Sequence, residues 1–202
     1  MGVKVGLDRE RVVAAAAELL ESDPAGAPPT LATLAARLGV RTQSLYAHVD
    51  GADGLRRELA LHALARLTER LRRAAIGVAG RDAIDGIVRA YVSFAAEHPG
   101  LYAASMRAPG DDPELRAAVA AAMEPLTVVF RSYGLDSAEA SHWYRMVFSC
   151  VYGFAALRRA GLMTMPGDPD ETLTRIVRVF GDQLERQAGV HTDGEGEPQR
   201  AP

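Results

Sequence analysis

The sequence predicts an all-α protein, and three observations support this prediction. Alanine, leucine, arginine and glutamate dominate the chain, whereas alternating β-branched residues are absent. Apolar residues instead recur at spacings of three and four, as they do on one face of a helix. No proline interrupts the chain between Pro29 and Pro99. With 202 residues, the chain is long enough to bury a core, either as one domain or as a small module joined to a larger one.

The first two helices are delimited by recognisable start and stop signals. One runs from about Asp8 to Glu21, and the linker SDPAGAPP that follows it at residues 22–29 is rich in helix breakers. Thr30 is a suitable N-cap for the next helix, and Gly39 stands where a left-handed residue ends one. Between these two caps lies one apolar face, formed by Leu31, Leu34, Ala35 and Leu38.

A short third helix follows a tight turn, with Leu45 and Val49 turned inward. Its outward positions, and those just before it, are hydrogen-bonding residues: Arg41, Thr42, Gln43, Ser44, Tyr46 and His48. A helix that presents hydroxyls, an amide, a phenol and an imidazole, with few carboxylates, suits the major groove of DNA. We therefore expect a helix-turn-helix that reads a duplex.

The centre of the chain predicts a series of further helices. A long helix starts near Asp53, has a leucine or alanine at every fourth position and ends by residues 77–80. Residues 82–97 form the next one, and Pro99 opens a short helix as its first residue. Another starts at residues 112–113, and Pro125 predicts a kink in it or two abutting helices.

Two long amphipathic helices close the predicted fold. One starts at Asp136, with a signal that resembles a capping box, and runs to Arg159. The other starts at residues 168–171, where acidic residues and a proline favour a first turn. The domains expected are residues 1–52 for DNA binding, 53–188 as a helical body and 189–202 as a disordered tail with almost no apolar content.

Composition sets the class of protein and the compartment. The net charge of −3 excludes a polybasic nucleic-acid binder, so DNA binding would rest on the local motif. The one cysteine, Cys150, cannot form an intrachain disulfide, which suits a reducing compartment. Because the chain has neither an apolar leader nor an apolar run long enough to span a bilayer, we expect a cytoplasmic protein without a membrane partner.

Residues 30–55, TLATLAARLGVRTQSLYAHVDGADGL, resemble the helix-turn-helix of the TetR family of bacterial transcription regulators. The most specific part is the Leu-Tyr-x-His-Val run at residues 45–49. Residues 90–106 and 151–163 are similar to the C-terminal domain of a TetR subgroup with a Trp-His-Gly-type pattern, although Tyr152 stands where the family often has histidine. The resemblance implies a TetR-like fold, with a three-helix DNA-binding head and a larger helical body for ligand binding and dimerisation.

The chemistry of the side chains suggests how they would contact DNA. Gln43 can form paired hydrogen bonds to adenine, and Arg41 can contact guanine or the backbone. Tyr46 and His48 are expected to donate to phosphate oxygens. Many family members have a lysine at the position of Ala52 or Asp53, and its phosphate contact would pass to Arg56 or Arg57. The DNA-binding residues expected are Thr30, Arg41, Thr42, Gln43, Ser44, Tyr46, His48 and Arg56.

In this family the helical body encloses a site for a small effector. Such a site is largely apolar, with a few polar groups. We expect the effector to meet Tyr91, Phe94, Tyr102, Met106 and Met146. At helical spacing, the alternative for each of these residues is an ordinary place in the core.

DNA recognition also requires two copies of the chain, because one recognition helix reads only a few base pairs. The closing helices would form a dimer interface as a four-helix bundle, two helices from each chain; their alternative role is packing within one chain. The interface residues expected are Phe154, Leu157, Leu162, Ile176, Val177, Phe180 and Leu184.

The sequence shows no nucleophile–base pair, no histidine pair with metal-ligand spacing and no glycine-rich phosphate loop, so we expect no enzyme activity, no metal and no cofactor. It predicts a ligand-responsive DNA-binding transcription regulator. The specific hypothesis is a repressor that a small hydrophobic effector releases from an inverted-repeat operator. The alternative is a helical small-molecule carrier, or an enzyme, on the same fold without DNA binding. An activator, or a regulator without an effector, is not separated from the repressor by sequence.

Overall fold

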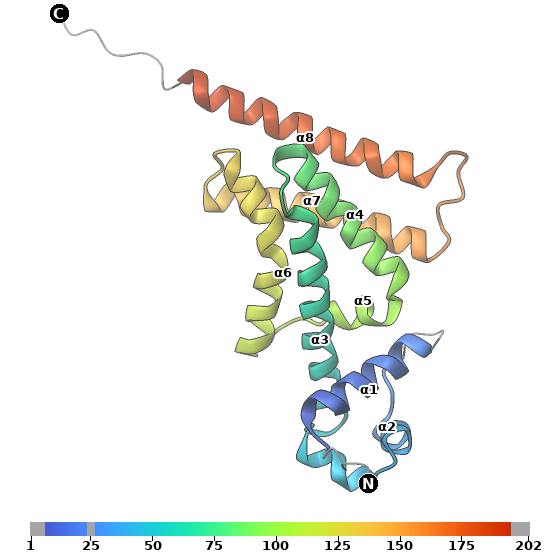
Figure 1. Ribbon diagram of the computed structural model, residues 1–202. Helices are drawn as coiled ribbons and strands as arrows, with labels where there is room; N and C mark the ends of the chain where they lie inside the picture. Colours follow the sequence, from blue (N-terminus) through green and yellow to red (C-terminus); the bar gives the residue numbers. More distant parts are fainter. Residues whose placement is uncertain (1–6, 24–26, 195–202) are drawn as a thin grey trace, which may run out of the picture. The chain divides into compact units, whose positions relative to one another are not determined.

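The computed structural model describes residues 7–23 and 27–194, and all regular structure in these ranges is helical (Figure 1). The prediction of an all-α fold is confirmed. The elements, in chain order, are α1 (Arg9–Ser22), α2 (Leu31–Leu38), the 3₁₀ helix η1 (Thr42–Ala47), α3 (Gly51–Ala75), α4 (Gly80–Glu97), α5 (Pro99–Ser105), α6 (Pro113–Ser132), α7 (Ser137–Arg159) and α8 (Pro169–Gly194).

The chain forms two compact units, each made of two separate stretches of sequence. We call residues 1–68 with 97–122 the head, and residues 69–96 with 123–202 the body. The boundary between them falls within α3 and within α6. This division differs from the expected boundary at residue 52, because α5 and the first turns of α6 pack with the N-terminal helices.

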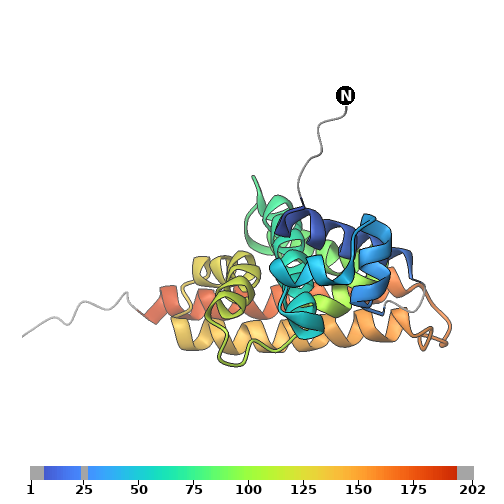
Figure 2. The same ribbon diagram turned by 90° about the horizontal axis from the view of Figure 1, so that it is seen from below.

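In the head, α5 lies against the C-terminal end of α1 (Figure 2). Gly100 is buried, and a Cβ at this position would stand 2.8 Å from Leu20 Cγ and 2.9 Å from the Leu20 carbonyl oxygen. The Glu21 carboxylate accepts a hydrogen bond from the Leu101 amide at 3.0 Å and pairs with His98 Nδ1 at 2.6 Å. A residue of α1 thus satisfies an amide in the first turn of α5, which would otherwise have no partner within its own helix.

The head parts of α3 and α6 join through small apolar side chains. Ala60, Leu64 and Leu115 are buried together. Around them pack the partly buried side chains of Leu61, Ala118, Val119 and Ala122. The alanines on α6 allow its backbone to approach α3 closely, as small residues do wherever helices cross at short range.

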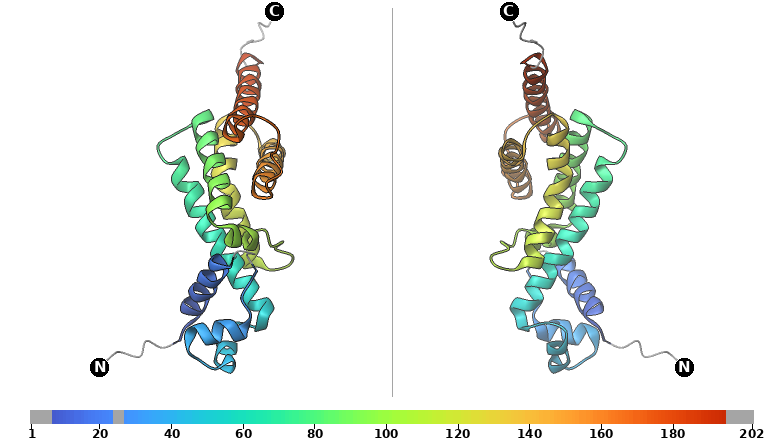
Figure 3. Two further views of the ribbon diagram at one scale, coloured as in Figure 1. Left: turned by 90° about the vertical axis from the view of Figure 1, so that its right-hand side faces the viewer. Right: turned by 90° about the vertical axis from the view of Figure 1, so that its left-hand side faces the viewer.

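In the body, α7 and α8 lie side by side (Figure 3). Aromatic side chains of α6, α7 and α8 pack against one another. The Trp143 ring lies 6.3 Å from Phe130 and 6.3 Å from Phe180, measured between ring centroids. The Trp143 indole N–H donates to Gln187 at 3.1 Å, so its polar end has a partner although the ring is buried.

Three local details differ from the sequence expectations. The second helix of the helix-turn-helix is the 3₁₀ helix η1. α6 continues through Pro125, which lacks the amide hydrogen for one helical hydrogen bond. α8 extends to Gly194, past the expected start of a tail at residue 189. The rest of that tail, residues 195–202, lies outside the described residues.

Candidate DNA-binding surface

Two caps fix the length of α2. The Thr30 hydroxyl accepts a hydrogen bond from the Thr33 amide at 3.1 Å, as an N-cap does. At the other end Gly39 has a φ of 67°, which is the left-handed region. The Gly39 amide donates to Ala36 O at 3.2 Å and the Val40 amide to Ala35 O at 3.0 Å. These two bonds form a Schellman motif, which turns the chain sharply from α2 towards η1.

η1 presents one apolar and one polar face. Leu45 and Val49 are buried in the head, as the sequence predicts. The Leu45 carbonyl accepts hydrogen bonds from the amides of His48, at 2.9 Å, and Val49, at 3.0 Å. Because Leu45 and Val49 are anchored, the side chains between and before them point outward, and the Tyr46 ring is 56 % exposed.

All eight residues that the sequence assigns to DNA contact belong to the head, and none of them is buried. Six of them are exposed: Thr30, Arg41, Gln43, Ser44, Tyr46 and Arg56. The other two, Thr42 and His48, are half-buried. The structure therefore brings together hydroxyl, amide, phenol and guanidinium groups around η1, which is the mixture of donors and acceptors that base edges and phosphates require.

The arginines near η1 differ in how far carboxylates of the same chain already occupy their guanidinium groups. Among the described residues, no carboxylate pairs with Arg41. Arg56, whose side chain is 52 % exposed, has one loose ion pair of 3.6 Å with Asp53. Arg57 lies one position further along α3, and its guanidinium pairs with three carboxylates. Of the two candidates for the missing phosphate-binding lysine, Arg56 has the freer guanidinium.

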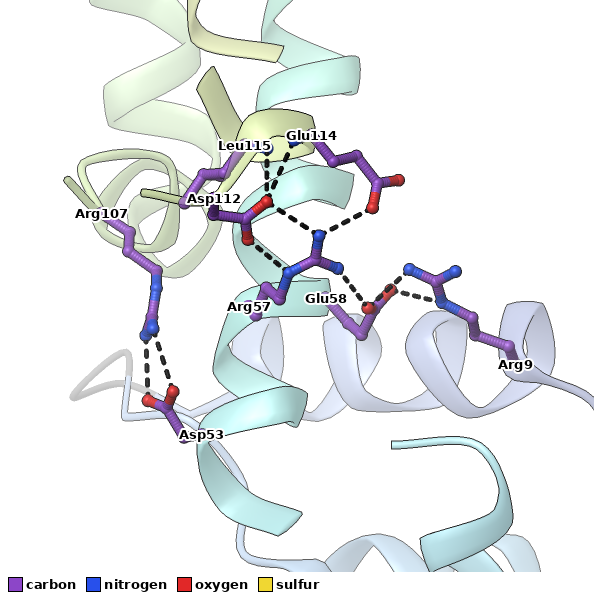
Figure 4. A network of polar contacts seen from close by, with 8 residues as sticks. All are labelled: Arg9, Asp53, Arg57, Glu58, Arg107, Asp112, Glu114 and Leu115. Carbon is purple, nitrogen blue, oxygen red and sulfur yellow. Dashed lines mark hydrogen bonds and ion pairs between the residues drawn. The ribbon is translucent and has the colours of Figure 1, made fainter. Parts of the chain in front are cut away.

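Arg57 is the centre of a polar network within the head (Figure 4). It donates to Asp112 at 2.5 and 3.0 Å, to Glu114 at 2.7 Å and to Glu58 at 3.1 Å. Glu58 in turn accepts two hydrogen bonds from Arg9 on α1, at 2.7 and 2.6 Å. Sequence reasoning missed this network, because its partners on α6 are too distant in the chain to leave a local pattern.

The five expected effector residues are divided between the head and the body. Tyr91 and Phe94 are buried in the body, where the Tyr91 ring meets Phe148 edge to face at 5.8 Å. Met146 also belongs to the body but is 53 % exposed. Tyr102 is buried in the head, and Met106 is half-buried there. α7 turns the Met146 side chain outward, and its contact with an effector stays a prediction.

The seven expected interface residues fall into three groups. Leu157 and Leu162 are exposed, and Ile176 is half-buried. Phe154, Val177 and Leu184 are buried within the protomer, where they pack on their own chain. Phe180, half-buried, packs on Trp143 of the same chain. The most apolar stripe of α8 is needed to hold the helix on its own body, which leaves the flanking residues outside.

Among residues 7–23 and 27–194, no three histidine, cysteine, aspartate or glutamate side chains lie where a metal ion would require them. Burial raises the pKa of the Cys150 thiol, which disfavours the reactive thiolate. Within the same ranges, none of the helices has the length and hydropathy that a bilayer-spanning segment requires.

Comparison with known proteins agrees with this geometry. The family described as "Tetracyclin repressor-like, C-terminal domain" matches residues 84–180. An uncharacterized HTH-type transcriptional regulator of Mycobacterium tuberculosis, Rv0681, is 36% identical over 183 residues, which are 90% of this chain and 83% of the relative. The chain belongs to the TetR family. This TetR-family protein is a DNA-binding transcription regulator and not an enzyme, so the alternative of an enzyme or a carrier without DNA binding is set aside.

Solved structures share the fold. A Rhodococcus protein of unknown function superposes with a TM-score of 0.77 at 26% identity, covering 92% of this chain and 99% of the other. The TetR family transcriptional regulator PfmR from Thermus thermophilus superposes with a TM-score of 0.59 at 18% identity, covering 88% and 97%. The second likeness bears on the fold alone.

Proposed function

We propose that two copies of this chain bind an inverted-repeat operator and insert η1 of each head into the major groove. The exposure of the polar side chains on η1, above the buried Leu45 and Val49, carries this proposal. Gln43 would read a base edge, whereas Tyr46 and Arg56 would contact phosphates and fix the register. A two-fold dimer matches two half-sites about one helical turn apart.

The outward faces of α7 and α8 support the proposed dimer. Met146 and Leu157 are exposed and about three helical turns apart, so they lie on the same face of α7. Val179, also exposed, lies on α8 next to the outward side of Ile176. Covering these apolar side chains with the same helices of a second copy would remove them from water, which favours association. Leu157, Leu162 and Ile176 remain interface candidates, and Met146 and Val179 join them.

We further propose a repressor whose operator affinity falls when a small hydrophobic molecule enters the body. The cluster of aromatic side chains at Tyr91, Tyr144 and Phe148 in the body supports this, because ligand sites are lined mainly by apolar and aromatic residues. Burial raises the pKa of Tyr144 to about 12, so its phenol stays neutral. The effector would act through a difference in its affinity for the DNA-binding and the released state.

DNA binding is tested by fluorescence anisotropy with a duplex from the region upstream of the protein's own gene. Gln43→Ala is expected to weaken binding to this duplex at least tenfold and leave binding to a scrambled duplex unchanged, because it removes a base contact. Tyr46→Phe is expected to weaken binding to both duplexes alike. Arg131→Gln, at an exposed position of α6 in the body, serves as the control. Wild-type affinity in both head variants would contradict the proposal.

The effector is tested by a thermal-shift screen of hydrophobic compounds, followed by anisotropy with each compound that raises the melting temperature. A true effector is expected to lower operator affinity in the wild type and to lose this effect in Tyr91→Leu. Compounds that stabilise the protein but leave operator binding unchanged would contradict release by an effector.

A further inference from the structure

The head contains a pocket of about 250 Å³, whose lining includes Met106, one of the five residues expected to meet the effector. Its apolar wall includes Leu20, Leu59, Gly100 and Met106. The charged residues of its lining are Arg56 and Arg107. A small apolar cleft with two guanidinium groups has the composition of a site for an amphipathic anion.

The two arginines share a single carboxylate. Arg107 donates to both oxygens of Asp53, at 3.2 and 3.1 Å (Figure 4). Arg56 Nε lies 3.6 Å from the same carboxylate. Asp53 is itself well exposed and is not part of the pocket wall. Two cations against one anion leave an excess of one positive charge at the pocket, which one further carboxylate would neutralise.

We propose that this pocket binds a small organic carboxylate with a short apolar chain. The chain would lie against Leu20, Leu59 and Met106 and lose its contact with water. The carboxylate would accept hydrogen bonds from the Arg107 guanidinium in the two-point geometry that arginine offers, and from Arg56 beside it. Asp53 would then be released from one or both arginines into solvent. Because Asp53 is exposed, losing the ion pair costs little free energy.

Such a ligand would also affect DNA binding, and this step rests on the proposed function. Arg56 is the residue that we assign to a DNA phosphate. A carboxylate held in the pocket engages the same guanidinium, so the ligand and the phosphate compete for it. The pocket would thus give this regulator a response to organic acids that is independent of an effector in the body.

The pocket is tested without DNA, by isothermal titration of the full-length protein with hexanoate and with hexanamide. Hexanoate is expected to bind once per chain, and hexanamide at least tenfold more weakly, because it carries the same hydrocarbon chain without the charge. Arg107→Gln is expected to weaken the binding of hexanoate at least tenfold. Arg116→Gln, at an exposed arginine on α6 outside the pocket, is expected to leave hexanoate affinity unchanged.

A second variant tests the apolar part of the site. Ala103 is exposed on α5 and lines the pocket, so Ala103→Phe would fill the pocket without disturbing the core. It is expected to abolish hexanoate binding while the melting temperature stays close to that of the wild type. Equal affinities for hexanoate and hexanamide, or unchanged binding in Arg107→Gln and Ala103→Phe, would overturn the proposed site. No binding of hexanoate at millimolar concentration would overturn it as well.

The effect on DNA is measured separately, by anisotropy with the operator duplex and added hexanoate. The dissociation constant for DNA is expected to rise several-fold in the wild type and to stay constant in Arg107→Gln. Hexanoate that binds in titration but leaves the DNA affinity unchanged overturns the competition for Arg56. Hexanoate binding by a protein that binds no duplex would instead overturn the proposed function and leave the pocket standing.

Discussion

Arg57 and Asp112 form a two-point ion pair between α3 and the start of α6. Arg57 Nε donates to Asp112 Oδ2 at 2.5 Å, and Nη2 donates to Oδ1 at 3.0 Å. The same Oδ1 accepts the amides of Glu114, at 3.0 Å, and Leu115, at 3.1 Å, so one carboxylate both caps α6 and holds it on α3. Since Glu58 links Arg57 to Arg9, α1 is connected to the same network.

Low pH is expected to reduce the stability of the head, because the Asp112 carboxylate becomes protonated. The hydrogen bond from Arg57, followed by the one from the Leu115 amide, lowers the pKa of this carboxyl to about 2. The folded state therefore favours the ionised form. Its contribution to stability is complete above the unfolded pKa of about 3.9 and is lost as the pH falls through about 2. Urea unfolding at a series of pH values should show a smaller acid dependence in Asp112→Asn than in the wild type.

The neighbouring carboxylate provides the control for this measurement. Asp111 is fully exposed, and its ion pair with Arg116 is 3.8 Å long. Asp111→Asn is therefore expected to retain the acid dependence of the wild type. Identical pH profiles for the wild type and Asp112→Asn would show that the Arg57–Asp112 pair contributes nothing to stability.

Gly39→Ala is expected to destabilise the head, although nothing lies within 4 Å of the added methyl group. The cost is conformational: a φ of 67° is unfavourable for alanine by about 1–2 kcal/mol. Gly39→Asn is the matched control, because asparagine tolerates the left-handed region better. Thermal unfolding should rank the wild type above Asn and Asn above Ala. Equal melting temperatures for the two variants would exclude backbone strain as the cause.

Gly100→Ala is expected to destabilise the head through a clash. The new methyl group would meet the Leu20 carbonyl at 2.9 Å, and a backbone atom cannot move aside as a side-chain tip can. Overpacking of this kind costs about 1–3 kcal/mol. Ala103→Ser, on the exposed side of the same short helix, should change the free energy of unfolding by less than about 0.5 kcal/mol. A Gly100→Ala variant as stable as the wild type would contradict the close approach of α5 to α1.

Leu157→Asp is expected to convert a dimer into a monomer, because it places a charge in the middle of the proposed interface. Light scattering coupled to size-exclusion chromatography measures the mass directly. Val128→Asp, at an exposed apolar position of α6 outside the proposed face, should keep the wild-type mass. If Val128→Asp dissociates the dimer and Leu157→Asp does not, the interface lies elsewhere.

Arg56→Gln is expected to weaken binding to specific and scrambled duplexes alike. Each phosphate contact that is lost makes the negative slope of log affinity against log salt less steep by about 0.9. Anisotropy titrations at four or five salt concentrations give this slope. Arg37→Gln is the control, because Arg37 is also exposed but pairs with Glu18 at 2.9 Å. An unchanged slope in Arg56→Gln would remove Arg56 from the phosphate contacts.

The sequence was sufficient to predict helix ends and buried helix faces, because both depend on residues that are close together in the chain. Thr30 and Gly39 mark the ends of α2, and Pro99 marks the start of α5, because capping depends on neighbouring residues only. The inward turn of Leu45 and Val49 follows from helical periodicity. These signals located the helix-turn-helix and its polar face.

Features that depend on distant residues were not predictable in this way. Nothing near Arg57 indicates that Asp112 will meet it, and nothing near Gly100 indicates the approach of Leu20. Val177 and Leu184 show why the partner of an apolar stripe is hard to predict: an amphipathic stripe packs equally well on its own chain or on another. Periodicity identifies the apolar face, whereas its partner is decided by the tertiary fold.

The contact of Glu21 with Leu101 and His98 bears on how this regulator could be re-engineered. A DNA reader excised as a single N-terminal fragment would lose the cover that α5 gives to Leu20 and would expose a leucine to water. Chimaeras that transplant this operator specificity onto another sensor therefore need a graft of two segments, with residues 97–122 carried alongside the first 68.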